Sequence, residues 1–284
     1  MKTQTTLSPN INWDIQTEPL LLSGKIIGDK KAILRNDNGS LLGIVGKDYF
    51  PVSNQSLLEL SKLICKAGEF ELKGFDEINN GRVILAFLQN KNPNLKLNNC
   101  VMREFLIIGN SHDGTRPFYI GTGSTLIRCE NQFYSTLKVF RKKHTSPLEY
   151  NEILASQIVR LYKQKKSQVY GVFDGMEQVP VRENQIRQMV KEIERLLNRE
   201  NKDSKKENSL SPSMQTLRAC IDREMRELGN NAFGLFNGVT WYTSHEMRNC
   251  DSELSRLNGT AGRINQKAFR FCNNLKQLQI KETV

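Results

Sequence analysis

Short apolar runs alternate with Asn- and Gly-containing turns through the first half of the chain. The runs at 32–34 and 41–45 flank Asn36-Asp-Asn-Gly39. Two further runs, ending at residue 72 and beginning at residue 82, flank Asn79-Asn-Gly81. Because Asn and Gly tolerate the positive φ of a tight turn, both patterns predict β-hairpins.

Two other stretches of the first half have helical spacing. Apolar residues recur three or four positions apart in 56–67, which Gly68 can end, and again in 131–140. This spacing places apolar side chains on one face of a helix. Between the two stretches, apolar runs at 101–108 and 118–128 predict a third strand pair.

The second half is dominated by helical spacing. Apolar positions three and four apart predict helices over 153–162, 182–199, 214–228 and 261–275. Gly229 is placed to cap the third of these helices.

The remaining segments of the second half have no such period. The aromatic, Gly-containing segment 233–243 is expected to be a loop packed on the core, and the charged segment 198–213 a mobile linker. The sequence therefore predicts an α+β fold. A β-rich part with an antiparallel sheet of hairpins and packed helices (1–146) precedes a helical part (147–284) that shares its core.

The net charge of the chain indicates the kind of partner that it binds. The 284 residues include 41 Lys and Arg against 30 Asp and Glu, a formal net charge of +11. Such an excess attracts polyanions, so nucleic acid is the expected partner, ahead of an acidic membrane surface. Residues 138–206 carry most of it, with 16 basic against nine acidic side chains. A charged helix face is usually only the solvated face, but three basic clusters within one region favour a stripe that follows phosphates, and both explanations stay open.

Several classes of site and location are disfavoured. The six cysteines are scattered and form no Cys-x-x-Cys pair, the spacing that structural zinc sites use. No apolar stretch approaches the length of a membrane span, and the N-terminus lacks the apolar segment of a signal peptide. We therefore expect free thiols, no metal, no cofactor, no membrane partner and a cytoplasmic location.

A donor-rich segment lies between the strands of the third pair. Its polar groups must all be satisfied in a half-buried hairpin, which is costly unless they organise a loop or hold a ligand. Asp113 is the natural counter-charge for Arg128, and we expect these two side chains to form one site. The candidate polar site comprises Asn110, Ser111, His112, Asp113, Gly114, His144 and His245.

Basic side chains near the same segment are candidates for phosphate contacts. Arg128 and Asn131 stand at an expected strand-to-helix switch, where a guanidinium beside a helix N-terminus commonly binds phosphate. A buried Arg paired with Asp113 or Glu130 is an equally good explanation. The candidate nucleic-acid contacts are Arg128, Asn131, Arg141, Lys142, Lys143, Lys163, Lys165 and Lys166. Aromatic residues of 233–243 could stack on bases, although aromatics at this density are more often core.

Other functions fit the same residues. The set His112, Asp113, His144 and His245 could bind a divalent metal or transfer protons, as in a metal-assisted hydrolase or nuclease. Its spacing matches no metalloenzyme signature, and hydrogen bonding within turns explains it more simply. The spacing therefore disfavours an enzyme, which stays the alternative to nucleic-acid binding. A non-catalytic protein that binds a host factor is the third alternative.

Several segments carry a family resemblance in a fixed order. They are 34–37, 42–45, Asp48-Tyr49, Gly81-Arg82, 110–114, 127–129 with Asn131, His144-Thr145, and 233–240 with Tyr242, Ser244 and His245. Together they resemble a phage- and plasmid-borne family of unknown function, often named phage/plasmid-like protein, over roughly residues 10–275. The chain departs from the pattern at Gln132, where the resemblance leads us to expect Thr.

The resemblance implies an accessory protein of mobile elements, near replication and recombination. Hairpins followed by helices also look broadly like the single-strand annealing recombinase fold, which is an analogy of fold alone. The expected function is therefore nucleic-acid binding in phage or plasmid DNA metabolism, inside a bacterial host cell. In its finer form, the protein binds or anneals single-stranded DNA, with a homo-oligomer as a further expectation.

Overall fold

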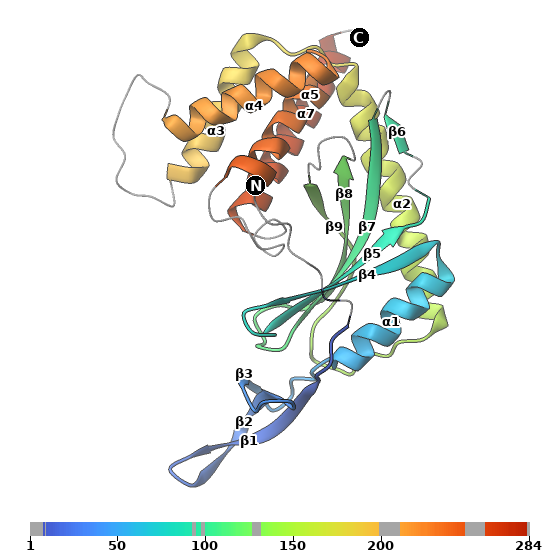
Figure 1. The fold of residues 1–284 in the computed structure, drawn as a ribbon, viewed down its shortest axis with the longest axis vertical. Coiled ribbons are helices and arrows are strands. Elements are labelled where there is room, and N and C mark those ends of the chain that lie inside the picture. Colours follow the sequence, from blue (N-terminus) through green and yellow to red (C-terminus); the bar gives the residue numbers. More distant parts are fainter. Residues whose placement is uncertain are drawn as a thin grey trace.

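The described residues form two antiparallel sheets followed by helices, which confirms the α+β fold class (Figure 1). The computed structural model describes Ser8 and residues 10–92, 95–97, 100–126, 132–198, 211–247 and 259–282. Most of the expected linker at 198–213 and the two candidate contacts Arg128 and Asn131 lie outside these residues.

A three-stranded sheet projects from one end of the molecule (Figure 1). It consists of β1 (Ile15–Leu22), β2 (Lys25–Arg35) and β3 (Leu41–Gly46), in that order. Gly39 makes the expected β2–β3 turn with φ of 70°. A second hairpin between β1 and β2, which the sequence pattern did not predict, turns at Ser23-Gly24, where both φ angles are positive.

The main sheet has six strands. Its order is β4 (Phe70–Ile78), β5 (Val83–Asn90), β7 (Cys100–Ser111), β8 (Phe118–Leu126) and β9 (Gln132–Lys142), and β6 (Leu95–Leu97) pairs with β7. The predicted turn at Asn79-Asn-Gly81 joins β4 to β5, and all three of its residues have positive φ. The helix α1 (Asn54–Ala67) begins after its N-cap Ser53, two residues before the expected start at residue 56, and ends at Gly68 as predicted.

The helix expected at 131–140 is wrong, because its described residues belong to strand β9. β9 pairs with β8, and its register shifts twice, on either side of Gly121. Such bulges insert extra residues and interrupt the two-residue alternation of a strand. The four-residue interval between Phe133 and Leu137 therefore imitated a helix.

The second half is helical. It contains α2 (Glu152–Glu177), α3 (Glu183–Asn198), α4 (Pro212–Leu228), α5 (Ala232–Trp241), a π-helical turn (Tyr242–Glu246) and α7 (Thr260–Glu282). Gly229 caps α4 with φ of 103°, as predicted. None of the helices within the described residues is both long enough and apolar enough to cross a membrane.

The loop expected at 233–243 is wrong, because the segment forms α5 and the turn after it. Asn231 caps α5 by accepting a hydrogen bond from the amide of Gly234. A Cβ added at Gly238 would lie 2.4 Å from the Cα of Ile221 in α4. The glycines therefore permit a close helix crossing rather than marking a loop.

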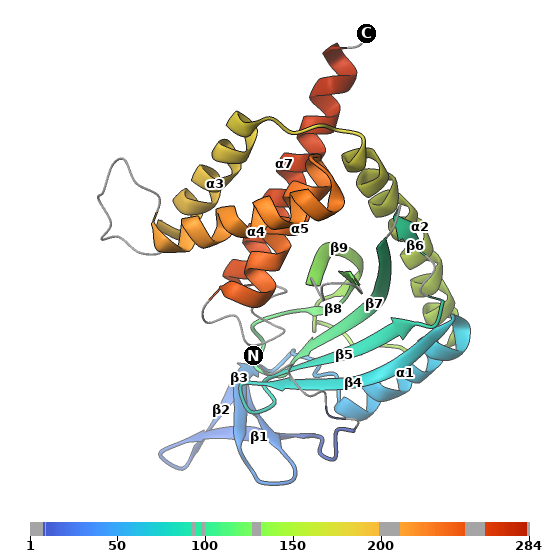
Figure 2. The same cartoon turned by 45° about the horizontal axis from the view of Figure 1, so that its top comes forward.

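α2 connects two hydrophobic cores. Its first turns, from Ala155 to Tyr162, pack with α1 and the main sheet. Its last turns, including Phe173 and Met176, pack with the helices that follow, in a cluster that also contains Met102 of β7. Figure 2 shows α2 running beside the main sheet towards these helices. The β-rich and helical parts thus meet along α2.

Candidate functional site

Two side chains at the end of β7 hold the segment that leads into α1. Asn110 donates from Nδ2 to the carbonyl of Val52 at 2.8 Å. Two residues further along the chain, Nε2 of His112 lies 3.0 Å from Oδ1 of Asn54. Both Asn110 and His112 are fully buried. These two polar residues therefore bind a neighbouring segment of the chain from within the core.

His144 holds the same segment from the end of β9. Its Nδ1 lies 3.0 Å from the carbonyl oxygen of Phe50, and its ring stacks on Tyr49 with a centroid distance of 4.6 Å. The hydroxyl of Tyr49 donates a 2.6 Å hydrogen bond to the carbonyl of Ser111. The structure therefore places His112 and His144 around one segment, residues 49–54.

Burial keeps both histidines neutral near pH 7. Asn54 donates through Nδ2 to the carbonyl of Trp13, so its Oδ1 accepts and Nε2 of His112 carries the proton. Burial lowers the pKa of His112 to about 4 and also lowers the pKa of His144. The pKa of His112 is therefore too low for a general acid or base near pH 7, and burial shifts the pKa of His144 in the same direction.

The loop after β7 is organised by Asp113. One carboxylate oxygen accepts hydrogen bonds from the Ser111 hydroxyl and from the amide and hydroxyl of Thr115. Burial raises the pKa of Asp113, but these hydrogen bonds outweigh that effect and leave the pKa lowered. Gly114 follows with φ of 75°. These contacts form a tight turn that is held by its own side chains, the simpler of the explanations that the sequence offered.

The expected pairing of Asp113 with Arg128 stays a prediction, because only Asp113 belongs to the described residues. Leu126, two residues before Arg128, pairs with Met102 near the beginning of β7, whereas Asp113 follows the last residue of that strand. Leu126 and Asp113 therefore lie at opposite ends of the β7–β8 pair.

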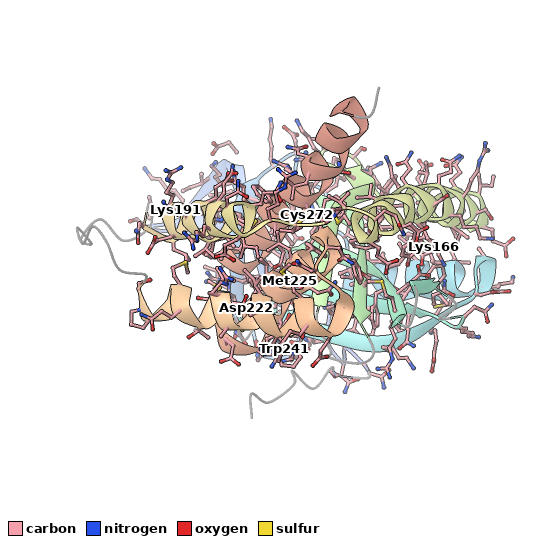
Figure 3. All side chains as sticks on the ribbon, turned by 90° about the horizontal axis from the view of Figure 1, so that it is seen from above. Lys166, Lys191, Asp222, Met225, Trp241 and Cys272 are labelled. Carbon is pink, nitrogen blue, oxygen red and sulfur yellow. The ribbon has the colours of Figure 1, made fainter. Side chains whose placement is uncertain are left out.

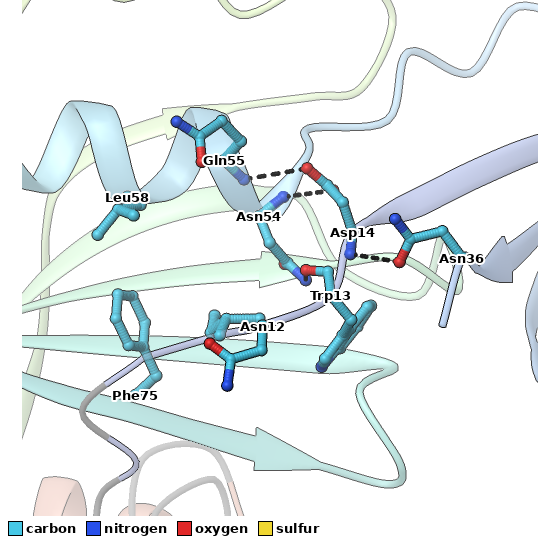
Figure 4. Close-up of a pocket in the computed structure, with 9 residues that line it drawn as sticks. Asn12, Trp13, Asp14, Asn36, Asn54, Gln55, Leu58 and Phe75 are labelled. Carbon is cyan, nitrogen blue, oxygen red and sulfur yellow. Dashed lines mark hydrogen bonds between the residues drawn. The ribbon is translucent and has the colours of Figure 1, made fainter. Parts of the chain in front are cut away.

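A small cavity of about 310 Å³ opens beside the first turn of α1 (Figure 4). The carboxylate of Asp14 accepts from the amides of Asn54 at 2.8 Å and Gln55 at 3.2 Å, while the amide of Asp14 donates to Asn36 at 2.7 Å. The positive end of the α1 dipole is thus already occupied by a carboxylate of the chain. Sequence reasoning did not single out Asp14, because the residues it binds lie far along the chain.

An ionic cluster next to this cavity also escaped sequence reasoning. Arg35 is buried, bonds both carboxylate oxygens of Asp37, and lies 3.9 Å from the ring centroid of Trp13. It also pairs with Glu77 at 3.2 Å. A Cβ added at Gly81 would lie 2.4 Å from the Trp13 ring. Arg35, Asp37 and Gly81 belong to the segments that carry the family resemblance, which was the available signal.

His245 lies in the helical part, apart from the other two histidines. Its ring packs on Trp241 with a centroid distance of 4.2 Å, and Arg223 lies 3.5 Å from the Trp241 ring centroid. The aromatic rings of Phe233 and Phe236 are buried in the helical core. Among the residues that the structure describes, no three His, Cys, Asp or Glu side chains are placed to hold a metal ion.

Basic side chains gather at the turn end of the main sheet. Arg141 and Lys142 of β9 pair with Tyr119 and Phe118, at the start of β8. Arg82 is at the β4–β5 turn, where its carbonyl accepts from the amide of His112 at 2.8 Å. We call this surface the basic end, and define it as Arg82, Arg116, Arg141, Lys142 and Lys143. These residues are exposed or partly exposed.

The basic residues of α2 lie elsewhere. Lys166 forms an ion pair with the buried Glu104, which also accepts 2.9 Å hydrogen bonds from Tyr162 and Asn90. Figure 3 labels Lys166 on the part of α2 beside the sheet. Glu104 precedes Ser111 by seven residues of β7, roughly 24 Å along a strand. The expected stripe from Arg141 to Lys166 is therefore divided, although Lys163 is exposed and Lys165 partly so.

The free thiols that the structure describes are those of Cys65, Cys220 and Cys272. Burial raises the pKa of each of them. No curated protein and no solved structure matches the chain. One family model does match, over residues 41–270, which is most of the chain. That match includes the loop after β7, both buried histidines and His245. On this match the chain belongs to the family described as "Domain of unknown function (DUF932)".

Proposed function

We propose that the protein binds nucleic acid through the basic end and acts as an accessory protein of phage or plasmid DNA metabolism. Its finer activity would be binding or annealing of single-stranded DNA in recombination or replication, in the cytoplasm of a bacterial host. The observation that carries the proposal is the convergence of Arg82, Arg116 and the 141–143 triple from three separate chain segments.

The electrostatics of this surface support a polyanion. Asp113 lies in the adjoining loop, where it accepts hydrogen bonds from Ser111 and Thr115, and the charge of Arg82 helps to lower its pKa. Within the described part of the chain, none of the five basic side chains forms an ion pair. Lys and Arg side chains outside ion pairs can neutralise phosphates, which releases condensed counterions. Lys166, in contrast, already neutralises Glu104.

The enzyme alternative gains no support from the geometry. His112 and His144 are buried, bind backbone or amide groups, and have lowered pKa values. His245 packs against Trp241 in another part of the fold. A binding role therefore fits the described residues better than metal-assisted hydrolysis.

Fluorescence polarisation with labelled single- and double-stranded DNA, titrated at several salt concentrations, tests the proposal. Binding should weaken with a log–log slope of roughly 0.7–0.9 per phosphate contact. The triple variant Arg141→Gln, Lys142→Gln, Lys143→Gln should bind more weakly. The slope of its log affinity against log salt should be smaller, by up to the contribution of about three phosphate contacts. Strand annealing of complementary labelled oligonucleotides tests the finer activity.

The matched control is Arg160→Gln, Lys163→Gln, Lys165→Gln, which removes the same charge from α2. It should change affinity less, because these residues lie away from the basic end. An equal loss of DNA affinity in both triple variants would mean that binding is spread over the basic surface and is not centred on the basic end. Absence of binding to any nucleic acid at low salt would refute the proposed function.

A further inference from the structure

The hairpin of β1 and β2 forms an arm that extends away from the rest of the molecule (Figures 1 and 2). We define the arm as residues 19–31. Leu21 pairs with Ile26 and Leu22 with Lys25, next to the turn at Ser23-Gly24. An isolated two-stranded ribbon is only marginally stable in water. The arm therefore gains most from a partner that covers it.

The tip of the arm is apolar on both of its faces. Leu21, Leu22 and Ile26 are 60%, 66% and 68% exposed. Because successive side chains of a strand point to opposite faces, Leu21 and Ile26 lie on one face and Leu22 on the other. A ribbon that packs on a flat surface would be apolar on one face only. These side chains instead suit a partner that encloses the tip.

The chemistry of the arm favours duplex DNA as that partner. Residues 20–31 contain three lysines (Lys25, Lys30 and Lys31) against one acidic residue, Asp29. Leu and Ile side chains are the kind that enter the minor groove, separate two base pairs and kink a duplex. Single-stranded DNA is bound mainly on aromatic rings, and residues 15–35 contain none.

The edge of the arm disfavours pairing with a second copy. Pro19 lies in β1, the outer strand of the three-stranded sheet, and is preceded by Glu18. Proline has no amide hydrogen to donate, and a charged residue on an edge strand opposes addition of another strand. Self-association through this edge is therefore poorly supported by its residues.

The base of the arm adjoins the basic end. A Cβ added at Gly43 of β3 would lie 2.5 Å from the Cα of Asp113, so the small sheet packs directly on the loop after β7. Lys31 of β2 pairs with Val45 of β3 in the same sheet. A nucleic acid on the basic end would therefore reach the arm. We infer that the tip of the arm inserts into the minor groove of bound duplex DNA and kinks it, an inference that rests on the proposed function.

The test compares three proteins on one duplex that carries a dye at each end and 2-aminopurine at its centre. The arm variant is Leu21→Ser, Leu22→Ser, Ile26→Ser, and the control is Leu41→Ser, Ile44→Ser on β3 of the same sheet. All five residues are exposed, so both variants should fold, which thermal melting checks. Wild type and control should bend the duplex by roughly 20–90° and raise 2-aminopurine fluorescence. The arm variant should bind with the wild-type salt slope and leave the duplex straight.

Three outcomes would overturn the inference. In the first, the arm variant bends the duplex as wild type does, or wild type binds without bending it. In the second, light scattering shows a wild-type oligomer that the arm variant loses, which makes the tip a protein contact. In the third, only wild type sediments with anionic lipid vesicles, which makes the tip a membrane contact. If wild type binds single-stranded DNA but none of the three proteins binds the duplex, the inference fails and the proposed function stands. Absence of binding to single-stranded and duplex DNA alike would instead refute the proposed function on which the inference rests.

Discussion

Nε2 of His112 lies 3.0 Å from Oδ1 of Asn54, the first residue of α1. The contact joins two residues that are 58 positions apart in the sequence. It fixes the start of a helix from the end of a strand, inside the core. The polar motif after β7 therefore anchors the start of α1 to the main sheet.

Stability should fall as the pH falls from 6.5 to about 4, because of His112. The pKa of this side chain is lowered from 6.5 to about 4 in the folded protein. Between these values the unfolded chain binds more protons, so acid favours unfolding. The contribution of His112 is fully present above pH 6.5, and about 2 kcal/mol of it should be lost at pH 5.

Urea unfolding of wild type and His112→Gln, each at about pH 7 and about pH 5, measures this effect. The variant should be less stable near neutral pH and should show a flatter pH dependence. His144 contributes in the same direction, so His144→Gln is the comparison that isolates its share. Retention of the full wild-type dependence in His112→Gln would show that His112 is not the group responsible.

Gly81→Ala should be much more destabilising than Gly39→Ala. Both glycines have positive φ, 87° and 70°, so each substitution costs backbone strain of about 1–3 kcal/mol. At Gly81 the new methyl group would also lie 2.4 Å from the Trp13 ring, which adds about 1–3 kcal/mol of overpacking. At Gly39 it meets nothing within 4 Å. Equal losses of unfolding free energy would mean that Trp13 can move aside.

Two helical glycines should respond to Ala in opposite directions. Gly171→Ala in α2 places a methyl group where nothing lies within 4 Å, and should stabilise the protein by about 0.5–1 kcal/mol. Gly238→Ala in α5 brings the methyl group 2.4 Å from Cα of Ile221, which is backbone and cannot rotate away. It should destabilise by about 1–3 kcal/mol. Thermal melting of the two variants and of wild type measures both changes in stability: the melting temperature should rise for Gly171→Ala and fall for Gly238→Ala.

The sequence was informative where structure is decided locally. The turns at Gly39 and Gly81 and the cap at Gly229 follow from positive φ, a property of single residues. The helix at 233–243 was missed because its glycines serve a contact with α4, which no local pattern reveals. The strand β9 was missed because its bulges depend on pairing with β8.

In the candidate site too, contacts between neighbouring residues could be predicted, and contacts between residues far apart in the sequence could not. The turn formed by Ser111, Asp113 and Gly114 is made within five residues and was open to prediction. The partners of His112 and Lys166, which are Asn54 and Glu104, lie 58 and 62 positions away. Lys166 was consequently assigned to phosphate binding, since a run of lysines does not reveal which one already has a buried partner.

Lys166→Met should destabilise the protein strongly, in contrast to Lys163→Met. Glu104 is 2% exposed, and Lys166 is its only cationic partner among the described residues. Removing one member of a buried ion pair leaves an uncompensated charge and costs roughly 3 kcal/mol or more. Lys163 is exposed, so its loss should change stability by no more than about 0.5 kcal/mol.

The double variant Glu104→Gln, Lys166→Met separates the ion pair from simple packing. A neutral amide can keep its hydrogen bonds to Asn90 and Tyr162, so the double variant should recover much of the stability that Lys166→Met loses. Urea unfolding of the three variants measures this, and DNA binding by Lys166→Met should keep the wild-type salt slope, because this lysine is already neutralised. A large loss of slope with no loss of stability would return Lys166 to the nucleic-acid interface.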